Sequence, residues 1–262
     1  MLKGKTVVVG VCGGIAAYKS AEIISRLKKM RADVKVVMTK SAQQFITPLT
    51  LQSLSHNPVA TDMFEKPVTW EIEHISLANA ADLMLIVPAT ANVIGKIANG
   101  IADDFLTTTV MATKAKVVFA PAMNCNMYEN PIVQENIKKL RALGYSFVEP
   151  GYGLLACGIE GKGRLAETDD IIEAVVENLL YTNKDLAGKN VVITAGPTRE
   201  KIDDVRFITN HSSGKMGYAL AKSAKRRGAN VTLISGKVNI PQIKGIETIY
   251  VESARDMFDA VM

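Results

Sequence analysis

The sequence predicts an α/β protein: a flavodoxin-like or Rossmann-like parallel sheet with helices on both faces, followed by an incomplete second α/β domain. Two observations lead to this prediction. Short runs rich in Val, Ile and Leu alternate with stretches whose apolar residues recur at helical spacing, which is typical of βαβ units. The same alternation restarts after a polar segment that contains glycine. Parallel sheets of this kind bind ligands at the carboxyl ends of their strands.

The strands of the first domain are expected to be buried on both faces, because their sequences are almost continuously apolar. They are expected over residues 5–11, 34–38, 82–87, 116–120 and 145–148. The stretches between the strands predict helices, because their apolar residues recur every three or four positions. These are expected over residues 15–30, 90–98, 103–113, 131–143 and 169–180.

The pattern predicts a first domain over residues 1–182, a linker over 183–189 and the start of a second domain over 190–262. In the second domain we expect strands over 190–194, 230–235 and 247–251, and helices over 216–227 and from 253 onward. So short an α/β segment buries little surface by itself. We therefore expect the second domain to be incomplete.

The composition is typical of a globular protein, with 48% hydrophobic and 22% charged residues. No apolar run approaches the roughly 20 residues that span a bilayer, and the N-terminus has no signal-peptide pattern. We therefore expect a cytoplasmic protein. The three cysteines have no Cys-x-x-Cys spacing, which argues against a disulfide framework and against a zinc site.

The net charge of +5 is unevenly distributed. Residues 1–182 hold 18 basic and 18 acidic residues, so the whole excess lies in residues 183–262. The basic excess could serve a phosphorylated ligand, or it could belong to a domain whose acidic part is absent. Basic runs with interleaved aromatic residues are missing from the sequence, so we do not expect nucleic-acid binding.

A glycine-rich turn follows the first predicted strand, in the run from Gly10 to Lys19. Gly13 and Gly14 would let backbone N–H groups approach a phosphate at the start of the next helix. A tight turn without a ligand is the alternative. A dinucleotide site would have an acidic residue at the end of the second strand, where this chain has Thr39-Lys40-Ser41. A mononucleotide is therefore favoured over NAD.

Two further motifs begin where predicted strands end. In Pro-Ala-Thr-Ala-Asn (88–92), Thr90 and Asn92 could cap the next helix and also contact a ligand. In Pro-Ala-Met-Asn (121–124), the amide of Asn124 could bind a carboxylate. Simple capping and a simple turn are the alternatives, because Asn and Thr commonly fill both roles.

Two candidate catalytic side chains stand apart from these motifs. A lone histidine such as His74 is more often structural than catalytic, and its local sequence does not reverse that expectation. Cys157 lies in a glycine-rich segment, 153–164, which could be a lid that closes over a pocket or an ordinary surface loop. A cysteine in such a segment is more reactive than a buried one.

The order and spacing of these motifs resemble the homo-oligomeric flavin-containing cysteine decarboxylases. More narrowly, the whole chain resembles bifunctional enzymes of coenzyme A synthesis. These join a decarboxylase for 4′-phosphopantothenoylcysteine to a phosphopantothenate–cysteine ligase. The resemblance implies FMN as cofactor, 4′-phosphopantetheine as product and an assembly built from trimers. It also implies an FMN site lined by Gly13, Gly14, Thr39, Ser41, Phe45, Thr90, Asn92 and Met123.

The resemblance implies three catalytic roles. His74 acts as a base or orients the substrate thiol, Asn124 holds the substrate carboxylate, and Cys157 donates a proton in the reductive half of the reaction. His74 and Asn124 would meet across a subunit boundary.

The resemblance extends into the second domain, where it implies a ligase that uses CTP and Mg²⁺. Arg206 and Asn210 match its motif, with Asn210 at the position that handles the acyl-nucleotide intermediate. We expect little ligase activity, because the part of the family pattern that carries its nucleotide-contacting lysines is missing.

Three competing functions are weighed against decarboxylation. A flavin-binding regulatory protein of the same fold would tend to lose His74, Asn124 or Cys157, all of which are present. An NAD-dependent dehydrogenase is disfavoured by the absence of an acidic residue after the second strand. Relatives that prenylate FMN lack the combination of Pro-Ala-Met-Asn and a cysteine-bearing segment.

Overall fold

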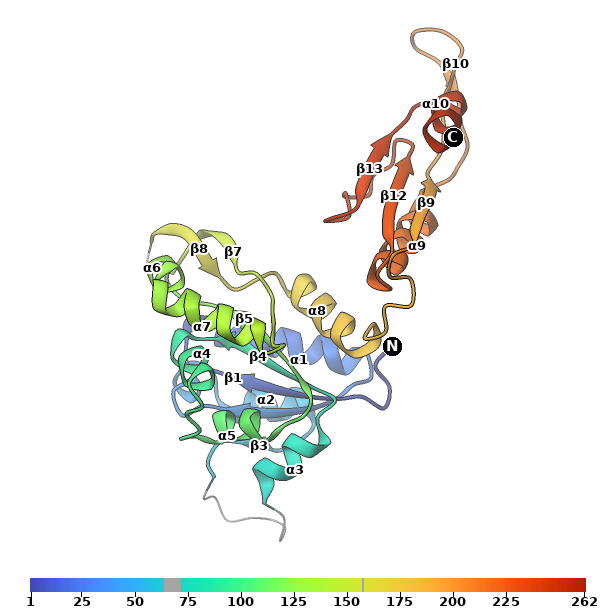
Figure 1. Ribbon diagram of the computed structural model, residues 1–262. Helices are drawn as coiled ribbons and strands as arrows, with labels where there is room; N and C mark the ends of the chain where they lie inside the picture. The colour runs from blue at the N-terminus through green and yellow to red at the C-terminus, as the bar shows by residue number, and fades with distance from the viewer. Residues whose placement is uncertain (64–71, 157) are drawn as a thin grey trace. The chain divides into compact units, whose positions relative to one another are not determined.

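The computed structural model of the chain describes residues 1–63, 72–156 and 158–262 (Figure 1). Its internal contacts divide the chain into two units, Met1–Leu180 and Tyr181–Met262. Cys157 lies outside the described residues.

Unit 1 is built on six parallel strands in the order β3-β2-β1-β4-β5-β6. Their bounds are β1 Thr6–Val11, β2 Asp33–Met38, β3 Val59–Ala60, β4 Leu83–Ala89, β5 Lys116–Pro121 and β6 Ser146–Phe147. After β1 the chain proceeds outward to β2 and β3, and it then returns to β4 on the other side of β1. The connections that leave β1 and β4 therefore run in opposite directions, which opens a crevice between the carboxyl ends of these two strands.

Helices cover both faces of this sheet (Figure 1). Helix α1 contacts α2 and α8, and α8 also contacts β4 and β5. On the other side, a buried apolar cluster joins the sheet to α3, α4, α5, α6 and α7. The bounds are α1 Ser20–Lys29, α2 Pro48–Ser55, α3 Glu73–Ala80, α4 Ala91–Ala98, α5 Phe105–Ala112, α6 Cys125–Glu129, α7 Pro131–Ala142 and α8 Thr168–Leu180.

The structure confirms the predicted strands and most of the predicted helices of unit 1, with small shifts at their ends. The predicted helix over 15–30 is divided, because η1 (Ile15–Lys19) is a 3₁₀ helix and the α-helix begins at Ser20. The Ser20 hydroxyl donates to the Ala17 carbonyl at 2.6 Å, which supports this tighter turn. Helix α2 was not predicted, although its N-cap Thr47 followed by Pro48 is a recognisable start signal.

The expectation of an ordinary surface loop over 153–164 is wrong, because most of this glycine-rich segment forms an antiparallel hairpin. The lid alternative remains a prediction. Strand β7 (Gly151–Leu154) pairs with β8 (Glu160–Arg164). Glycine is depleted in strands, so the sequence concealed this hairpin. Here glycine is needed because the backbone lies directly against a neighbouring segment: a Cβ on Gly163 would lie 2.3 Å from the carbonyl oxygen of Met123.

Unit 2 contains a parallel sheet in the order β13-β12-β9, with α9 packed on β9 and β12. Its core surrounds the fully buried Leu233 and Ala221, and the Tyr218 hydroxyl lies 3.1 Å from that of Ser235. The predicted strands and helices are confirmed, whereas a short hairpin, β10–β11, was not predicted. The bounds are β9 Asn190–Ala195, β10 Glu200–Lys201, β11 Phe207–Ile208, α9 Lys215–Arg226, β12 Asn230–Ser235, β13 Glu247–Tyr250 and α10 Ala254–Val261.

Neither unit offers a membrane-spanning helix: within the described residues, every helix is too short or too polar to cross a bilayer.

Candidate active site

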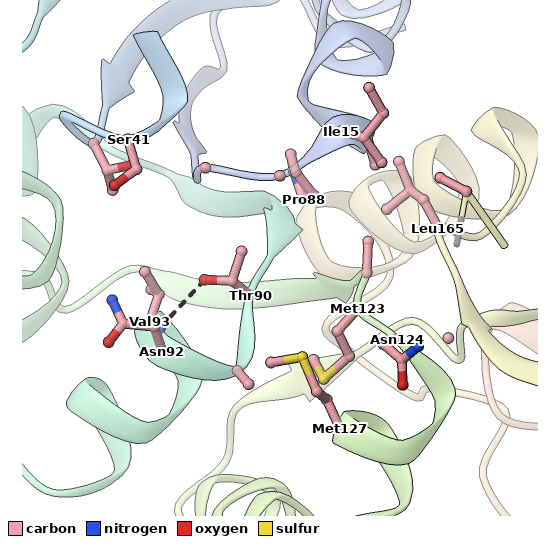
Figure 2. Close-up of a pocket in the computed structure, with 18 of the residues that line it drawn as sticks. Ile15, Ser41, Pro88, Thr90, Asn92, Val93, Met123, Asn124, Met127 and Leu165 are labelled. Carbon is pink, nitrogen blue, oxygen red and sulfur yellow. Dashed lines mark hydrogen bonds between the residues drawn. The ribbon is translucent and has the colours of Figure 1, made fainter. Parts of the chain in front are cut away.

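A cavity of about 960 Å³ opens at the carboxyl ends of the unit 1 strands (Figure 2). It is large for a small-molecule site, since such sites span roughly 300–1,000 Å³. Its walls come from the loops after β1, β2, β4 and β5, and from β7 and β8. The predicted site residues among its lining are Gly13, Gly14, Thr39, Ser41, Thr90, Asn92, Met123 and Asn124.

In the cavity wall, the glycine-rich turn lies directly against the loop after β2. A Cβ on Gly13 would lie 2.4 Å from Cβ of Ser41 and 2.9 Å from its carbonyl carbon, so only glycine fits there. Gly14 is extended and precedes η1, whose first backbone N–H groups lack partners within the helix. These N–H groups and the positive end of the helix dipole suit an anion.

The loop after β4 combines capping with a place in the cavity wall. The Thr90 hydroxyl oxygen accepts a hydrogen bond from the Val93 N–H at 3.4 Å, which caps α4 (Figure 2). Asn92 follows in the first turn of α4, where its side chain is exposed and lines the cavity. The capping alternative is therefore correct for Thr90, but it does not exclude a second role.

The loop after β5 contributes Met123 and Asn124 from the opposite side of the cavity (Figure 2). The Met123 N–H donates to the Gly163 carbonyl oxygen at 2.9 Å, so this loop is bonded to β8. Asn124 is the N-cap of α6, and its side-chain oxygen accepts from the Asn126 N–H at 2.9 Å. This bond fixes the side chain of Asn124 in the cavity wall.

Two predicted site residues lie outside the cavity of this chain. Phe45 follows η2 (Ala42–Gln44), is 47% exposed and is not among the lining residues. His74, in α3, is half-buried with its ring edge-on to Phe105 at a centroid distance of 6.1 Å. The third predicted catalytic residue, Cys157, lies outside the described residues.

The cavity has a basic lining that the sequence analysis did not assign to the site. Lys19, Lys40, Lys96 and Arg164 line it, and Asp104 is the acidic residue among the described lining residues. Lys96 follows Asn92 by one helical turn, and this i, i+4 spacing was the signal that could have identified it.

Lys96 links two helices beside the cavity. Its ammonium lies 2.7 Å from a carboxylate oxygen of Asp103 and 3.4 Å from Asp104, the N-cap of α5. The hydrogen bond with Asp103 raises the pKa of Lys96, so its positive charge persists across the physiological range.

Cys12, in the glycine-rich turn, is structural. Its side chain is fully buried, and this burial raises the pKa of the thiol to about 12 despite a hydrogen bond from the Thr90 backbone. A thiol of that pKa stays protonated and unreactive near neutral pH.

The predicted ligase residues of unit 2 are exposed. The Arg206 guanidinium donates to Asp203 at 2.6 Å, and the Asn210 side-chain oxygen accepts from the Ser212 N–H at 2.9 Å. Both lie in the segment between β10 and α9.

A parallel sheet whose carboxyl edge carries a glycine turn and a large basic cavity defines a nucleotide-binding α/β protein. The chain belongs to the flavoprotein family, whose model, described as Flavoprotein, matches residues 1–180. Residues 186–262 match the model of the DNA/pantothenate metabolism flavoprotein C-terminal domain.

Individual relatives describe the similarity more narrowly than the two family models do. The chain is 53% identical over 264 residues to the coenzyme A biosynthesis bifunctional protein CoaBC of Bacillus subtilis (strain 168), covering 100% of this chain and 65% of that protein. It therefore spans just under two thirds of that relative's length.

Two solved structures are similar to unit 1. A cysteine-to-serine mutant of PPC decarboxylase complexed with pantothenoylaminoethenethiol is 30% identical with a TM-score of 0.59, over 65% of this chain and 96% of that one. The FMN-dependent cysteine decarboxylase SpaF is 31% identical with a TM-score of 0.57, over 67% and 99%.

Proposed function

We propose that unit 1 binds FMN and decarboxylates 4′-phosphopantothenoylcysteine to 4′-phosphopantetheine in coenzyme A synthesis. The observation that carries this proposal is the convergence of three motifs on one cavity. The glycine turn, the Thr90–Asn92 loop and the Met123–Asn124 loop all line it. The names of the relatives, a coenzyme A biosynthesis protein and cysteine decarboxylases, support the same function.

The residues present fit a flavin mononucleotide. The close approach of Gly13 to Ser41 leaves backbone rather than side chain at the start of η1, which is what a phosphate needs. Lys19 and Lys40 add positive charge to the cavity wall. Thr39, Ser41, Thr90 and Asn92 supply polar groups for the rest of the cofactor.

FMN, when bound, supplies the reversible two-electron oxidation of the substrate thiol that makes loss of CO₂ feasible. Asn124 would hold the substrate carboxylate, because its capped position aims a rigid amide at the cavity. Cys157 would return a proton to the product carbon. His74 would act as a base or orient the thiol.

His74 can take this role only at a site that a second copy of the chain completes. In the described residues it lies on α3 against Phe105, away from the lining of the cavity. We therefore propose a homo-oligomer built from trimers, in which His74 and Asn124 meet across a subunit boundary.

For unit 2 we propose that it is part of a phosphopantothenate–cysteine ligase that uses CTP and Mg²⁺, with little ligase activity in this chain by itself. The match to the pantothenate-metabolism domain supports it. Arg206 and Asn210 would contact the acyl-nucleotide, which requires that the exposed Arg206 exchange Asp203 for a phosphate.

The experiment that tests the main proposal is an absorption spectrum of the purified chain, followed by heat release of its chromophore, mass analysis and an assay of CO₂ release from 4′-phosphopantothenoylcysteine. Bound FMN together with CO₂ release is the expected result. Bound FMN without CO₂ release favours the flavin-binding regulatory alternative. A colourless chain that cannot be reconstituted with FMN refutes the proposal.

A further inference from the structure

Strand β8 forms one wall of the cavity, but it has glycine at its two closest contacts with the start of α6. A Cβ on Gly161 would lie 2.7 Å from Cβ of Cys125, and one on Gly163 would lie 2.3 Å from the Met123 carbonyl oxygen. At these two positions β8 therefore has no side chain that could interlock with α6. The direct links are a backbone bond from the Met123 N–H to the Gly163 carbonyl oxygen at 2.9 Å and the Lys162 ammonium, which lies 5.4 Å from the centroid of the Tyr128 ring of α6.

A carboxylate outside the cavity provides a further attachment. Glu149 precedes β7, and its Oε2 accepts a hydrogen bond from Lys162 Nζ of β8 at 2.8 Å. Its Oε1 accepts from the Arg141 guanidinium of α7. The Tyr128 hydroxyl of α6 donates to Oε2 at 3.3 Å. One side chain thus joins β8 to both helices beneath it.

This network is charged at neutral pH. Partial burial acts to raise the pKa of Glu149, but hydrogen bonds from Lys162 and Arg141 prevail and lower it to about 2. Each ion pair by itself is weak, because the Glu149 side chain is 45% exposed. Charge-assisted bonds from three donors to one carboxylate are stronger and more directional than an isolated pair.

Neighbouring positions along β8 border different spaces. Gly163 and Arg164 line the cavity, whereas Lys162 lines a separate hollow of about 420 Å³ together with Tyr128, Arg141 and Glu149. No described residue lines both spaces. The network can therefore act on the site only through the position of β8 and α6.

We propose that Glu149 is a positioning residue that holds β8 against α6 and so sets the cavity wall formed by Gly163, Arg164 and Asn124. Its effect on turnover rests on the proposed decarboxylase function. Its effect on the position of β8 does not.

The test compares Glu149→Gln with the wild-type chain by hydrogen exchange and by kinetics. Glu135→Gln is the matched control, since Glu135 is an exposed carboxylate on α7. In Glu149→Gln the Met123 amide and the amides of residues 161–164 should exchange about fivefold faster, while β1 and β4 stay unchanged. KM should rise about fivefold with FMN content unchanged. Glu135→Gln should match wild type throughout.

A double-mutant cycle with Lys162→Met separates positioning from a general loss of charge. If Glu149 acts through Lys162, the double variant should show about the same KM as either single variant rather than the product of the two effects. Unchanged exchange at Met123 overturns the proposal, and so do fully multiplicative effects. Faster exchange with an unchanged KM would mean that Glu149 affects only the stability of this region, and this result also overturns the proposal. If the wild-type chain releases no CO₂, the proposed function fails, while the exchange data still decide whether Glu149 holds β8.

Discussion

Gly13 and Ser41 approach so closely that a single methyl group on Gly13 would lie 2.4 Å from the Ser41 Cβ. This contact joins the loops after β1 and β2 and leaves backbone exposed at the start of η1. The proposed phosphate site depends on it, because a side chain here would displace the phosphate or the Ser41 loop.

Gly13→Ala should therefore weaken FMN binding by about tenfold or more, since overpacking of this kind costs roughly 1–3 kcal/mol. Flavin fluorescence titration of the apoprotein measures it. Gly95→Ala is the control, because the nearest atom to a Cβ on Gly95 is 3.7 Å away and the position is helical. That variant should bind FMN normally and gain up to about 1 kcal/mol of stability. Equal affinities for all three proteins would contradict the phosphate cradle.

Asn124 has a capping role that must be separated from its proposed role toward substrate. Asn124→Ser keeps an N-cap of similar strength, whereas Asn124→Ala removes it at a cost of about 1 kcal/mol. Both variants should retain FMN and lose CO₂ release by about a hundredfold, because substrate is no longer oriented. If Asn124→Ser were fully active, the capping function alone would explain the residue.

The position of His74 predicts complementation between copies. His74→Ala and Asn124→Ala should each be inactive as pure oligomers. Co-expression of the two with different affinity tags should restore partial CO₂ release in the mixed oligomers, because some sites then contain His74 from one copy and Asn124 from the other. Inactive mixed oligomers would argue that both residues belong to the same copy.

Cys157→Ser should uncouple the two halves of the reaction. Under air, where O₂ can reoxidise the flavin, CO₂ release should continue while an oxidised enethiol product accumulates in place of 4′-phosphopantetheine, since the proton donor for the last step is lost. Without O₂, CO₂ release should stop at about one equivalent per bound FMN, because the electrons removed from the substrate stay on the flavin. Mass spectrometry of the product distinguishes the two compounds, which differ by two hydrogens. Normal output of 4′-phosphopantetheine would remove Cys157 from the mechanism.

The pKa of Glu149 predicts how stability depends on pH. Its pKa is lowered from 4.5 in the unfolded chain to about 2 in the folded one. The ionised carboxylate therefore stabilises the fold above about pH 4.5, and this contribution is lost as the pH falls toward 2. The stability gap between wild type and Glu149→Gln, measured by urea unfolding, should be widest near neutral pH and smaller at about pH 3. A stability gap that widens on acidification would show that the network does not stabilise the ionised carboxylate of Glu149.

Local patterns were enough to predict most of the secondary structure. The strands from 5–11 to 116–120 are confirmed because each is an apolar run that is mostly buried, and such runs differ clearly from helical spacing. The strand predicted over 145–148 is confirmed only as the short edge strand β6, Ser146–Phe147, which is half-buried. The hairpin of β7 and β8 was concealed, because its glycines carry no strand signal. The need for Gly161 and Gly163 comes in part from contact with Cys125 and Met123, which are distant in sequence.

By itself the sequence determined the parallel α/β architecture of unit 1 and the strand-end motifs that line its cavity, because both depend on short-range patterns. Tertiary structure alone decided which residues share the cavity. It brought Lys96 and Arg164 to the lining and left Phe45 and His74 outside it. The strand order decides which loops share the cavity. Strands β1 and β4 are far apart along the chain but adjacent in the sheet, so the loops that follow them meet in space.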